Sequence, residues 1–256
     1  MKIGCIGVGT IASAIVTGFC KGEDQSHTFY LSPRNEKKAA ALSDAYENVT
    51  VCASNQEVID QSELIILALV PKAAEEILSP LSFRKDQVIV SFMSDFPVAR
   101  IKEVVGDVKK VVRVLPLPFN ALCVGPVAVY PKDQEVCDLF SKVGNIVAID
   151  DESKMETMLA ITGVMSAYYG LTYEITKWGE KAGLSKEESV GYTTAFFEAL
   201  SVQAGICPGL DVNALANEYT PGGLNEMGLV AVRDEAHAYD AWTTVLDQIL
   251  ARLKKK

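Results

Sequence analysis

Small residues at the start of the chain carry its clearest chemical signal, a glycine turn between a strand and a helix. The apolar stretch Lys2–Ile6 is typical of a buried strand, and Gly-Val-Gly-Thr-Ile-Ala follows it directly. In this arrangement Gly7 permits the tight turn, Gly9 lets a diphosphate approach the backbone, and Ala12 lets the helix pack against the strand. Free N–H groups at the start of the helix then face the phosphates. The pattern therefore predicts a dinucleotide-binding site.

The stretch after the second expected strand indicates which dinucleotide is bound. Sites that prefer NAD usually carry an acidic residue there, and its carboxylate binds the ribose hydroxyls. In this chain Ser32, Pro33 and Arg34 follow the strand, and no acid stands at its end. A guanidinium and a hydroxyl both suit a 2′-phosphate. The sequence thus predicts that NADP(H) is preferred over NAD(H).

Composition narrows the class of protein and its partners. The chain has 256 residues, of which 49% are hydrophobic, and its net charge is −9. The hydrophobic content predicts a folded protein with a sizeable core, and the acidic balance argues against nucleic acid or an anionic membrane as the main partner. No apolar run is long enough to cross a bilayer, and the first residues enter a strand rather than a signal peptide. We therefore expect a cytoplasmic protein that acts on a small molecule.

The residue types that usually bind metals are few and dispersed. The two histidines and six cysteines form no C-x-x-C pair and no His–Cys cluster in the sequence. Scattered cysteines among apolar neighbours are typical of reduced thiols that are buried as small hydrophobic side chains. The sequence therefore predicts no metal site.

The first 150 residues alternate short apolar runs with helical stretches. The run Leu64–Leu69 is apolar at every position, which is typical of a parallel strand covered on both faces. The expected strands are Lys2–Ile6, Thr28–Leu31, Val49–Cys52, Leu64–Leu69, Val88–Phe92, Val111–Leu115, Val127–Val129 and Ile146–Ile149. This alternation predicts an α/β fold with a doubly wound Rossmann sheet, forming an NADP-binding domain over residues 1–150.

The pattern changes after Asp150, where long amphipathic helices replace the strands. The expected helices are Ser153–Ala182, Lys186–Ala204, Val212–Asn217, Gly223–Arg233 and His237–Leu253. Residues 151–256 are thus predicted to form an all-helical domain. This domain has more apolar surface than a small bundle needs, including Tyr168, Tyr169, Tyr192, Phe196 and Phe197. We therefore expect it to pack against a second copy of the chain.

Three further motifs carry a resemblance to a known family. They are Val112–Pro116, Thr162–Tyr168 and Thr220–Asn225, and together with residues 7–12 they look like the pyrroline-5-carboxylate reductase family, in order and at suitable spacing. The resemblance covers essentially the whole chain. It implies reduction of a cyclic imino acid to proline with hydride from NAD(P)H. It also implies a Rossmann domain followed by a helical domain that interlocks two subunits in a homodimer, often within a ring of dimers.

The resemblance also implies the cofactor contacts. These are Gly7, Gly9, Thr10, Ile11 and Ala12 at the pyrophosphate, Ser32 and Arg34 at the 2′-phosphate, Asn55 on the adenosine side, and the segment Ala68, Leu69, Val70 and Pro71 beside the cofactor. In that last segment Val70 stands where the family has a lysine.

The motifs of the second half depart from the family where the substrate is expected. The implied substrate contacts are Met165, Thr220, Gly222, Gly223, Leu224 and Asn225. Leu224 and Asn225 replace two small residues, of which the family's second is a threonine that bonds the substrate. Thr162, Tyr168 and Asn225 are the candidate catalytic residues, since each can donate a hydrogen bond, although an amide is a poor proton source. We therefore expect a more apolar pocket and a substrate that is pyrroline-5-carboxylate or a related imino acid.

Two other functions fit parts of the pattern. A β-hydroxyacid dehydrogenase shares the two-domain plan and uses a lysine and an asparagine on the first long helix. Lys154 stands near that place, but Thr157 and Met158 replace the amide side chains. The altered substrate motifs also suit a non-catalytic NADP-binding relative that has a regulatory role.

Overall fold

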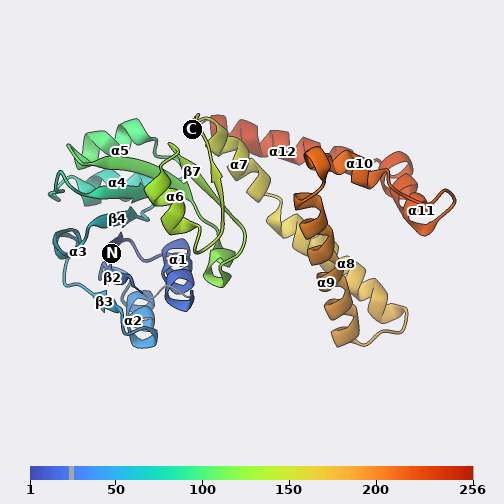
Figure 1. Cartoon of the computed structure of the whole chain (residues 1–256), viewed down its shortest axis with the longest axis horizontal. Helices are drawn as coiled ribbons and strands as arrows, with labels where there is room; N and C mark the ends of the chain where they lie inside the picture. Colours follow the sequence, from blue (N-terminus) through green and yellow to red (C-terminus); the bar gives the residue numbers. More distant parts are fainter. Residues whose placement is uncertain (23–25, 256) are drawn as a thin grey trace. The chain divides into compact units, whose positions relative to one another are not determined.

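The computed structural model describes residues 1–22 and 26–255, which form two compact units. Unit 1 is Met1–Met155 and unit 2 is Glu156–Lys256; among the described residues, the strands lie in unit 1 and unit 2 contains only helices (Figure 1). In the sequence, the boundary between the two units lies close to Asp150, where the pattern of apolar residues changes. The expected α/β fold with a helical second half is confirmed.

The strands of unit 1 form one sheet in the order β3-β2-β1-β4-β5-β6-β7-β8. Their bounds are β1 Lys2–Ile6, β2 Thr28–Leu31, β3 Val49–Val51, β4 Leu64–Leu67, β5 Val88–Ser91, β6 Lys110–Leu115, β7 Pro126–Tyr130 and β8 Asn145–Ala148. The strands from β1 to β6 pair in parallel. β7 runs antiparallel to β6, and β8 runs parallel to β7. The chain therefore reverses strand direction only after the six parallel strands of the Rossmann sheet are complete.

Two hydrophobic clusters cover the two faces of this sheet. The helices that supply them are α1 Thr10–Lys21, α2 Glu36–Ala45, α3 Asn55–Gln61, α4 Pro71–Leu78, α5 Val98–Val105 and α6 Gln134–Phe140. Strand β4 shows the division, because Leu64 and Ile66 belong to one cluster while Ile65 and Leu67 belong to the other. A strand whose successive side chains face opposite sides must be apolar throughout when both sides are covered. This explains the uninterrupted apolar run in the sequence.

The cysteines behave as small hydrophobic residues. All six are free, and five of them are buried. Burial in the sheet raises the pKa of Cys5 to about 12, and burial together with the nearby Glu57 carboxylate raises that of Cys52 to about 11. These thiols stay protonated near neutral pH, which makes them poor nucleophiles.

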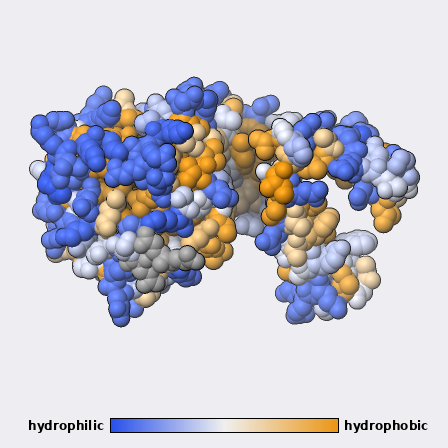
Figure 2. All heavy atoms as spheres, viewed as in Figure 1, coloured by the Kyte–Doolittle hydropathy of each residue, from blue (hydrophilic) through white to orange (hydrophobic). Residues whose placement is uncertain are grey.

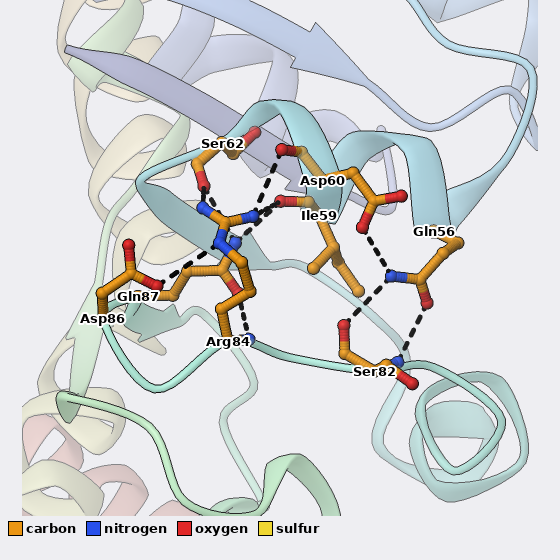
Figure 3. Close-up of polar contacts among 8 residues, drawn as sticks. All are labelled: Gln56, Ile59, Asp60, Ser62, Ser82, Arg84, Asp86 and Gln87. Atoms are coloured by element: carbon orange, nitrogen blue, oxygen red, sulfur yellow. Dashed lines mark hydrogen bonds and ion pairs between the residues drawn. The ribbon is translucent and has the colours of Figure 1, made fainter.

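Two side chains from the loop before β5 bind the C-terminal end of α3 (Figure 3). The buried Gln87 amide donates to the carbonyl oxygens of Ile59 at 2.7 Å and Ser62 at 2.8 Å. Arg84 donates to the same two carbonyls, and its positive charge lies at the negative end of the helix dipole. Carbonyls at a helix end lack partners within the helix, so these contacts fix where α3 ends.

Gln87→Leu is expected to lower the free energy of unfolding by about 1–2 kcal/mol, because the buried carbonyls lose a donor that leucine cannot replace. Chemical denaturation of the full chain measures this change. Gln56→Leu is the matched control, since the Gln56 amide pairs with the backbone of Ser82 at an exposed place in the same network. We expect the control to change stability by less than about 0.5 kcal/mol. Equal effects of the two substitutions would contradict the role given to burial.

Unit 2 is built from helices that the sequence largely predicts. Their bounds are α7 Lys154–Thr162, α8 Met165–Lys181, α9 Lys186–Gly205, α10 Val212–Ala216, α11 Leu224–Val230 and α12 Ala238–Lys254, with short 3₁₀ and π turns at Pro208–Leu210 and Ala231–Glu235. Ser185 begins α9 with a capping box, in which its side chain and that of Glu188 each accept from the other's backbone N–H.

The prediction of one helix over Ser153–Ala182 is wrong, because the helix breaks at Gly163 and Val164. An added Cβ at Gly163 would lie 2.7 Å from the Cδ1 atom of Ile249 in α12. The close approach of α12 therefore leaves little room for a side chain at the break unless Ile249 moves. The sequence of the first helix alone does not reveal this contact, since its partner lies some 86 residues further on.

Many large apolar side chains of unit 2 are exposed (Figure 2). Trp178 on α8 is 70% exposed, and Tyr192 on α9 is 75% exposed. Phe196 and Phe197 on α9 are in ring contact with each other, and Tyr168 on α8 stacks obliquely on Phe197. An exposed apolar surface of this kind usually marks an interaction site.

Candidate functional site

The glycine turn after β1 is shaped so that only glycine fits at its first position. Gly7 has a φ of +93°, and an added Cβ would lie 2.5 Å from the carbonyl oxygen of Ala68. Its N–H donates to the hydroxyl oxygen of Ser32 at 2.9 Å. The ends of β2 and β4 thus hold the turn from both sides.

Gly9 leaves the start of α1 uncovered. It is the N-cap residue, no side chain caps the helix, and the first turn contains no acid. An added Cβ at Gly9 would meet no described atom within 4 Å. The N–H groups that a helix leaves unpaired at its start therefore face open space, and they suit an anion. This opening fits the diphosphate of a dinucleotide cofactor.

The sheet order places the other proposed cofactor residues around the same opening. β1 lies between β2 and β4, and the helices that follow β1 and β4 pack on opposite faces of the sheet, so the strand order reverses direction at this point. Ligands of doubly wound sheets bind in the crevice formed there, beyond the carboxyl ends of the strands. The chain brings Ser32 to the end of β2, Asn55 to the first turn of α3 after β3, and Ala68 to the end of β4.

The two residues predicted to bind a 2′-phosphate lie in different environments. Ser32 is 1% exposed, and its hydroxyl oxygen already accepts from Gly7. Arg34 is exposed and has no hydrogen bond or ion pair with any described residue. The guanidinium is therefore available to a ligand, whereas the serine holds the glycine turn.

The segment after β4 continues the rim of the opening. Leu69 is half-buried against the glycine turn, Val70 is 69% exposed at the N-cap of α4, and Pro71 is the first residue of that helix. Proline suits this position because its missing N–H would be unpaired there in any case. Val70 supplies an apolar side chain at the place where the resemblance implies a lysine.

The Pro-Gly-Gly turn precedes α11. Gly222 has a φ of +73°, the N–H of Gly223 donates to the Thr220 carbonyl at 2.8 Å, and Leu224 is 83% exposed. The carboxylate of Glu226 accepts from the N–H of Gly222. The N–H of Gly222, which was expected to face a substrate carboxylate, therefore already donates to a negatively charged side chain.

Asn225 lines a cavity of about 560 Å³ within unit 2. Its apolar walls come from Leu200 on α9 and from Val212 and Leu215 on α10. Gln203 and Glu218 add polar groups to the lining. Asn225 thus lines a space with both apolar and polar walls.

The other catalytic candidates lie at the break between α7 and α8. The Thr162 hydroxyl donates to the Leu159 carbonyl at 2.7 Å, and Met165 is the half-buried first residue of α8. Tyr168 is exposed, one turn further along α8. Within unit 2, Figure 1 shows α11 well separated from this break. A single chain therefore does not bring Thr162 and Tyr168 together with Asn225.

Lys154 is engaged at the start of α7. Its ammonium group forms an ion pair with the Asp150 carboxylate, and this hydrogen bond raises the pKa of Lys154. A lysine that exchanges protons during catalysis near neutral pH needs a lowered pKa instead. In this structure Lys154 is thus held in an exposed ion pair at the start of α7.

Lys38 lies near the glycine turn but is not among the cofactor residues expected from the sequence. The Lys38 ammonium lies 2.9 Å from the hydroxyl oxygen of Thr10, the first residue of α1. The only signal in the sequence is the spacing of four residues from Arg34.

Among the residues described, no cluster of three or more His, Cys, Asp or Glu side chains could hold a metal ion. The helices in this part of the chain are also too short or too polar to cross a membrane.

Comparison with known proteins finds similarity to NADP-dependent oxidoreductases and to pyrroline-5-carboxylate reductases. A family model described as NADP oxidoreductase, coenzyme F420-dependent, matches residues 2–95. Pyrroline-5-carboxylate reductase 2 of Bacillus subtilis is 28% identical over 248 residues, covering 91% of this chain and 87% of its own length. The match therefore includes both units.

Solved structures show the same fold along the whole chain. The 1-pyrroline-5-carboxylate reductase from Streptococcus pyogenes aligns with a TM-score of 0.82 and 24% identity, covering 100% of this chain and 99% of the other. The Plasmodium falciparum pyrroline carboxylate reductase with NADP bound aligns with a TM-score of 0.80 and 21% identity, covering 100% and 97%. With the sequence match over both units and the glycine turn at the sheet's switch point, these likenesses make the chain similar to the pyrroline-5-carboxylate reductases in fold and, at 28% identity, in sequence.

Proposed function

We propose that this protein is an NADPH-dependent reductase of a cyclic imine, either pyrroline-5-carboxylate, which would give L-proline, or a related imino acid. The observation that carries the proposal is the similarity to the Bacillus subtilis enzyme over 91% of the chain. The open start of α1 supports it, because the turn fits the diphosphate of the cofactor.

The preference for NADPH over NADH rests on the loop after β2. The loop Ser32-Pro33-Arg34 offers a guanidinium that is unpaired among the described residues, where NAD sites usually carry an acid. Because Ser32 is buried beneath the glycine turn, we assign the larger part of the preference to Arg34. A guanidinium binds phosphate oxygens through paired N–H donors.

The chemistry asks little of the protein beyond placement. A bound nicotinamide cofactor would supply a hydride to the imine carbon, and the nitrogen would keep the proton of the iminium group. An imine that is already protonated needs no further acid, so the weak proton donor Asn225 is compatible with this reaction. We propose that Asn225 hydrogen-bonds the substrate, and that Gly223, Leu224, Thr220 and Met165 shape its pocket.

NADPH oxidation, followed by absorbance, tests the proposed reaction. Separate assays with the full chain use NADPH with pyrroline-5-carboxylate, with a carboxylate-free cyclic imine or with a 2-keto acid. A further assay uses NADP with a 3-hydroxy acid. We expect turnover with a cyclic imine and none with the oxygen substrates. Turnover of the 3-hydroxy acid would support a β-hydroxyacid dehydrogenase instead. Tight NADPH binding without turnover of any compound would support a non-catalytic NADP-binding protein, which the distance between α11 and the α7–α8 break favours as second candidate.

A second copy of the chain is part of the proposal. The exposed aromatic side chains on α8 and α9 and the separation of the catalytic candidates both suit a homodimer whose subunits complete each other's sites. Light scattering on the purified protein tests this arrangement. We expect a dimer or a ring of dimers, and a monomer that turns over substrate would contradict it.

Glu226→Gln is expected to lower KM for pyrroline-5-carboxylate about fourfold with little change in kcat. Two negative charges about 5 Å apart in water repel each other by about 0.8 kcal/mol, and the Glu226 carboxylate lies at the turn proposed to receive the substrate carboxylate. Steady-state kinetics measure the effect. Glu187→Gln, in the first turn of α9, is the matched control and should leave KM unchanged. A raised KM in Glu226→Gln would instead assign Glu226 to ordering the turn.

A further inference from the structure

Lys38 places a positive charge beside the start of α1. It is the third residue of α2, and its ammonium nitrogen lies 2.9 Å from the Thr10 hydroxyl oxygen. The side chain is half-buried and forms no ion pair with a described carboxylate. An ammonium group has three donors, and Thr10 uses one of them. A full charge and two donors thus remain available at the edge of the opening.

Asn35 fixes the position from which Lys38 extends. The side-chain oxygen of Asn35 accepts from the Lys38 N–H, which caps the start of α2. Its side-chain nitrogen donates to the Val8 carbonyl at 2.9 Å, inside the glycine turn. One amide therefore ties the first turn of α2 to the loop that is proposed to bind the diphosphate. This tie keeps the first turn of α2 close to the start of α1, where Lys38 reaches Thr10.

We propose that Lys38 binds the 2′-phosphate of NADP(H) together with Arg34, and that these two cations set the cofactor preference. This inference rests on the proposed function, because it concerns the same cofactor site. The adenosine ribose of a Rossmann cofactor lies at the end of β2, which leads directly into Arg34 and α2. Arg34 extends from the loop and Lys38 from the first turn of the helix, so the two flank this position.

Charge and chemistry favour the 2′-phosphate over the diphosphate as the partner of Lys38. The diphosphate is served by the unpaired N–H groups of α1, which no side chain covers. A 2′-phosphate carries up to two negative charges and needs its own cations, which a chain with a net charge of −9 must supply locally. Lysine provides a compact charge, while Arg34 provides directional paired donors.

Lys38→Met tests the inference, since methionine keeps an apolar stem of similar length and removes the charge. Dissociation constants for NADPH and NADH are measured by nucleotide fluorescence on the full chain at one fixed ionic strength. We expect NADPH to bind about tenfold more weakly and NADH to change less than about twofold. Lys37→Met is the matched control, because it removes the same charge from the neighbouring exposed position and should leave both constants unchanged.

The contrary results are distinct from a failure of the proposed function. An equal loss for both nucleotides in Lys38→Met would overturn the inference, because the lysine would then serve the diphosphate or the fold. Unchanged binding of NADPH would overturn it as well. Wild-type protein that binds NADPH but reduces no imine would refute the proposed reaction and leave the binding comparison intact. Equal wild-type affinities for the two nucleotides would refute the cofactor preference itself.

Discussion

Replacing Gly9 by alanine is expected to weaken NADPH binding about a hundredfold while leaving Tm nearly unchanged. The added methyl group meets no described atom within 4 Å, and the backbone at Gly9 has a φ of −87°, so the substitution causes no strain in the free protein. A bound diphosphate would have to approach this backbone closely, and the methyl group would stand in its place. A hundredfold loss corresponds to about 2.8 kcal/mol of binding free energy. Titration with NADPH and thermal unfolding measure the two quantities.

Gly7→Ala is the contrasting variant. Its methyl group would lie 2.5 Å from the Ala68 carbonyl oxygen at a φ of +93°, so the free protein itself must distort. We expect Gly7→Ala to lower Tm as well as cofactor affinity. If Gly9→Ala bound NADPH as tightly as wild type, no diphosphate would lie over the start of α1. The proposed cofactor site would then be wrong at its centre.

The sequence predicts unit 1 well because its signals are local. A strand, two glycines and a helix stand next to one another in the first 21 residues, and each can be identified without knowledge of distant residues. The apolar run of β4 likewise reveals that both faces of the sheet are covered. The break between α7 and α8 could not be predicted in this way, because the contact of Gly163 with Ile249 in α12 joins residues far apart in the sequence.

The side chains of the candidate site show the same limit. The sequence places Ser32 and Arg34 side by side, yet only the three-dimensional structure separates a buried serine that accepts from Gly7 from an exposed arginine. The contact of Lys38 with Thr10 joins two helices whose sequences give no sign of each other. The ligand contacts themselves stay predictions, since they depend on how the cofactor, the substrate and a second copy of the chain bind.

Arg113 shows how a residue in a family-like motif can serve the fold rather than the reaction. It lies in β6 with only 2% of its surface exposed, and one guanidinium nitrogen is 2.7 Å from a carboxylate oxygen of Glu152. The other terminal nitrogen donates to the Ser94 carbonyl in the loop after β5. The same Glu152 oxygen accepts from the N–H of Val98, the first residue of α5. This single ion pair thus joins β6, the loop after β5, the start of α5 and the segment that enters α7.

Arg113→Met is therefore expected to lower the free energy of unfolding of unit 1 by about 3 kcal/mol. The substitution leaves a partly buried carboxylate without its counter-charge and the Ser94 carbonyl without its donor, and removing one partner of a buried pair typically costs 3–5 kcal/mol. Because Glu152 remains partly exposed, we expect the lower end of that range. For a unit of this size the loss corresponds to a decrease in Tm of roughly 10 °C.

Glu152→Gln provides the control for Arg113→Met, because glutamine keeps an oxygen that accepts from both Arg113 and Val98 while its charge is lost. We expect it to cost about 1 kcal/mol, so the two variants should differ clearly in calorimetry. If the Tm of Arg113→Met were equal to or higher than that of wild type, the free energy needed to desolvate the ion pair would be at least as large as the stabilisation from its contacts. We expect the Tm of Arg113→Met to lie well below that of Glu152→Gln. That order would show that the hydrogen bonds of Arg113 hold the last segment of unit 1 against the sheet, and that they matter more than the charge of Glu152.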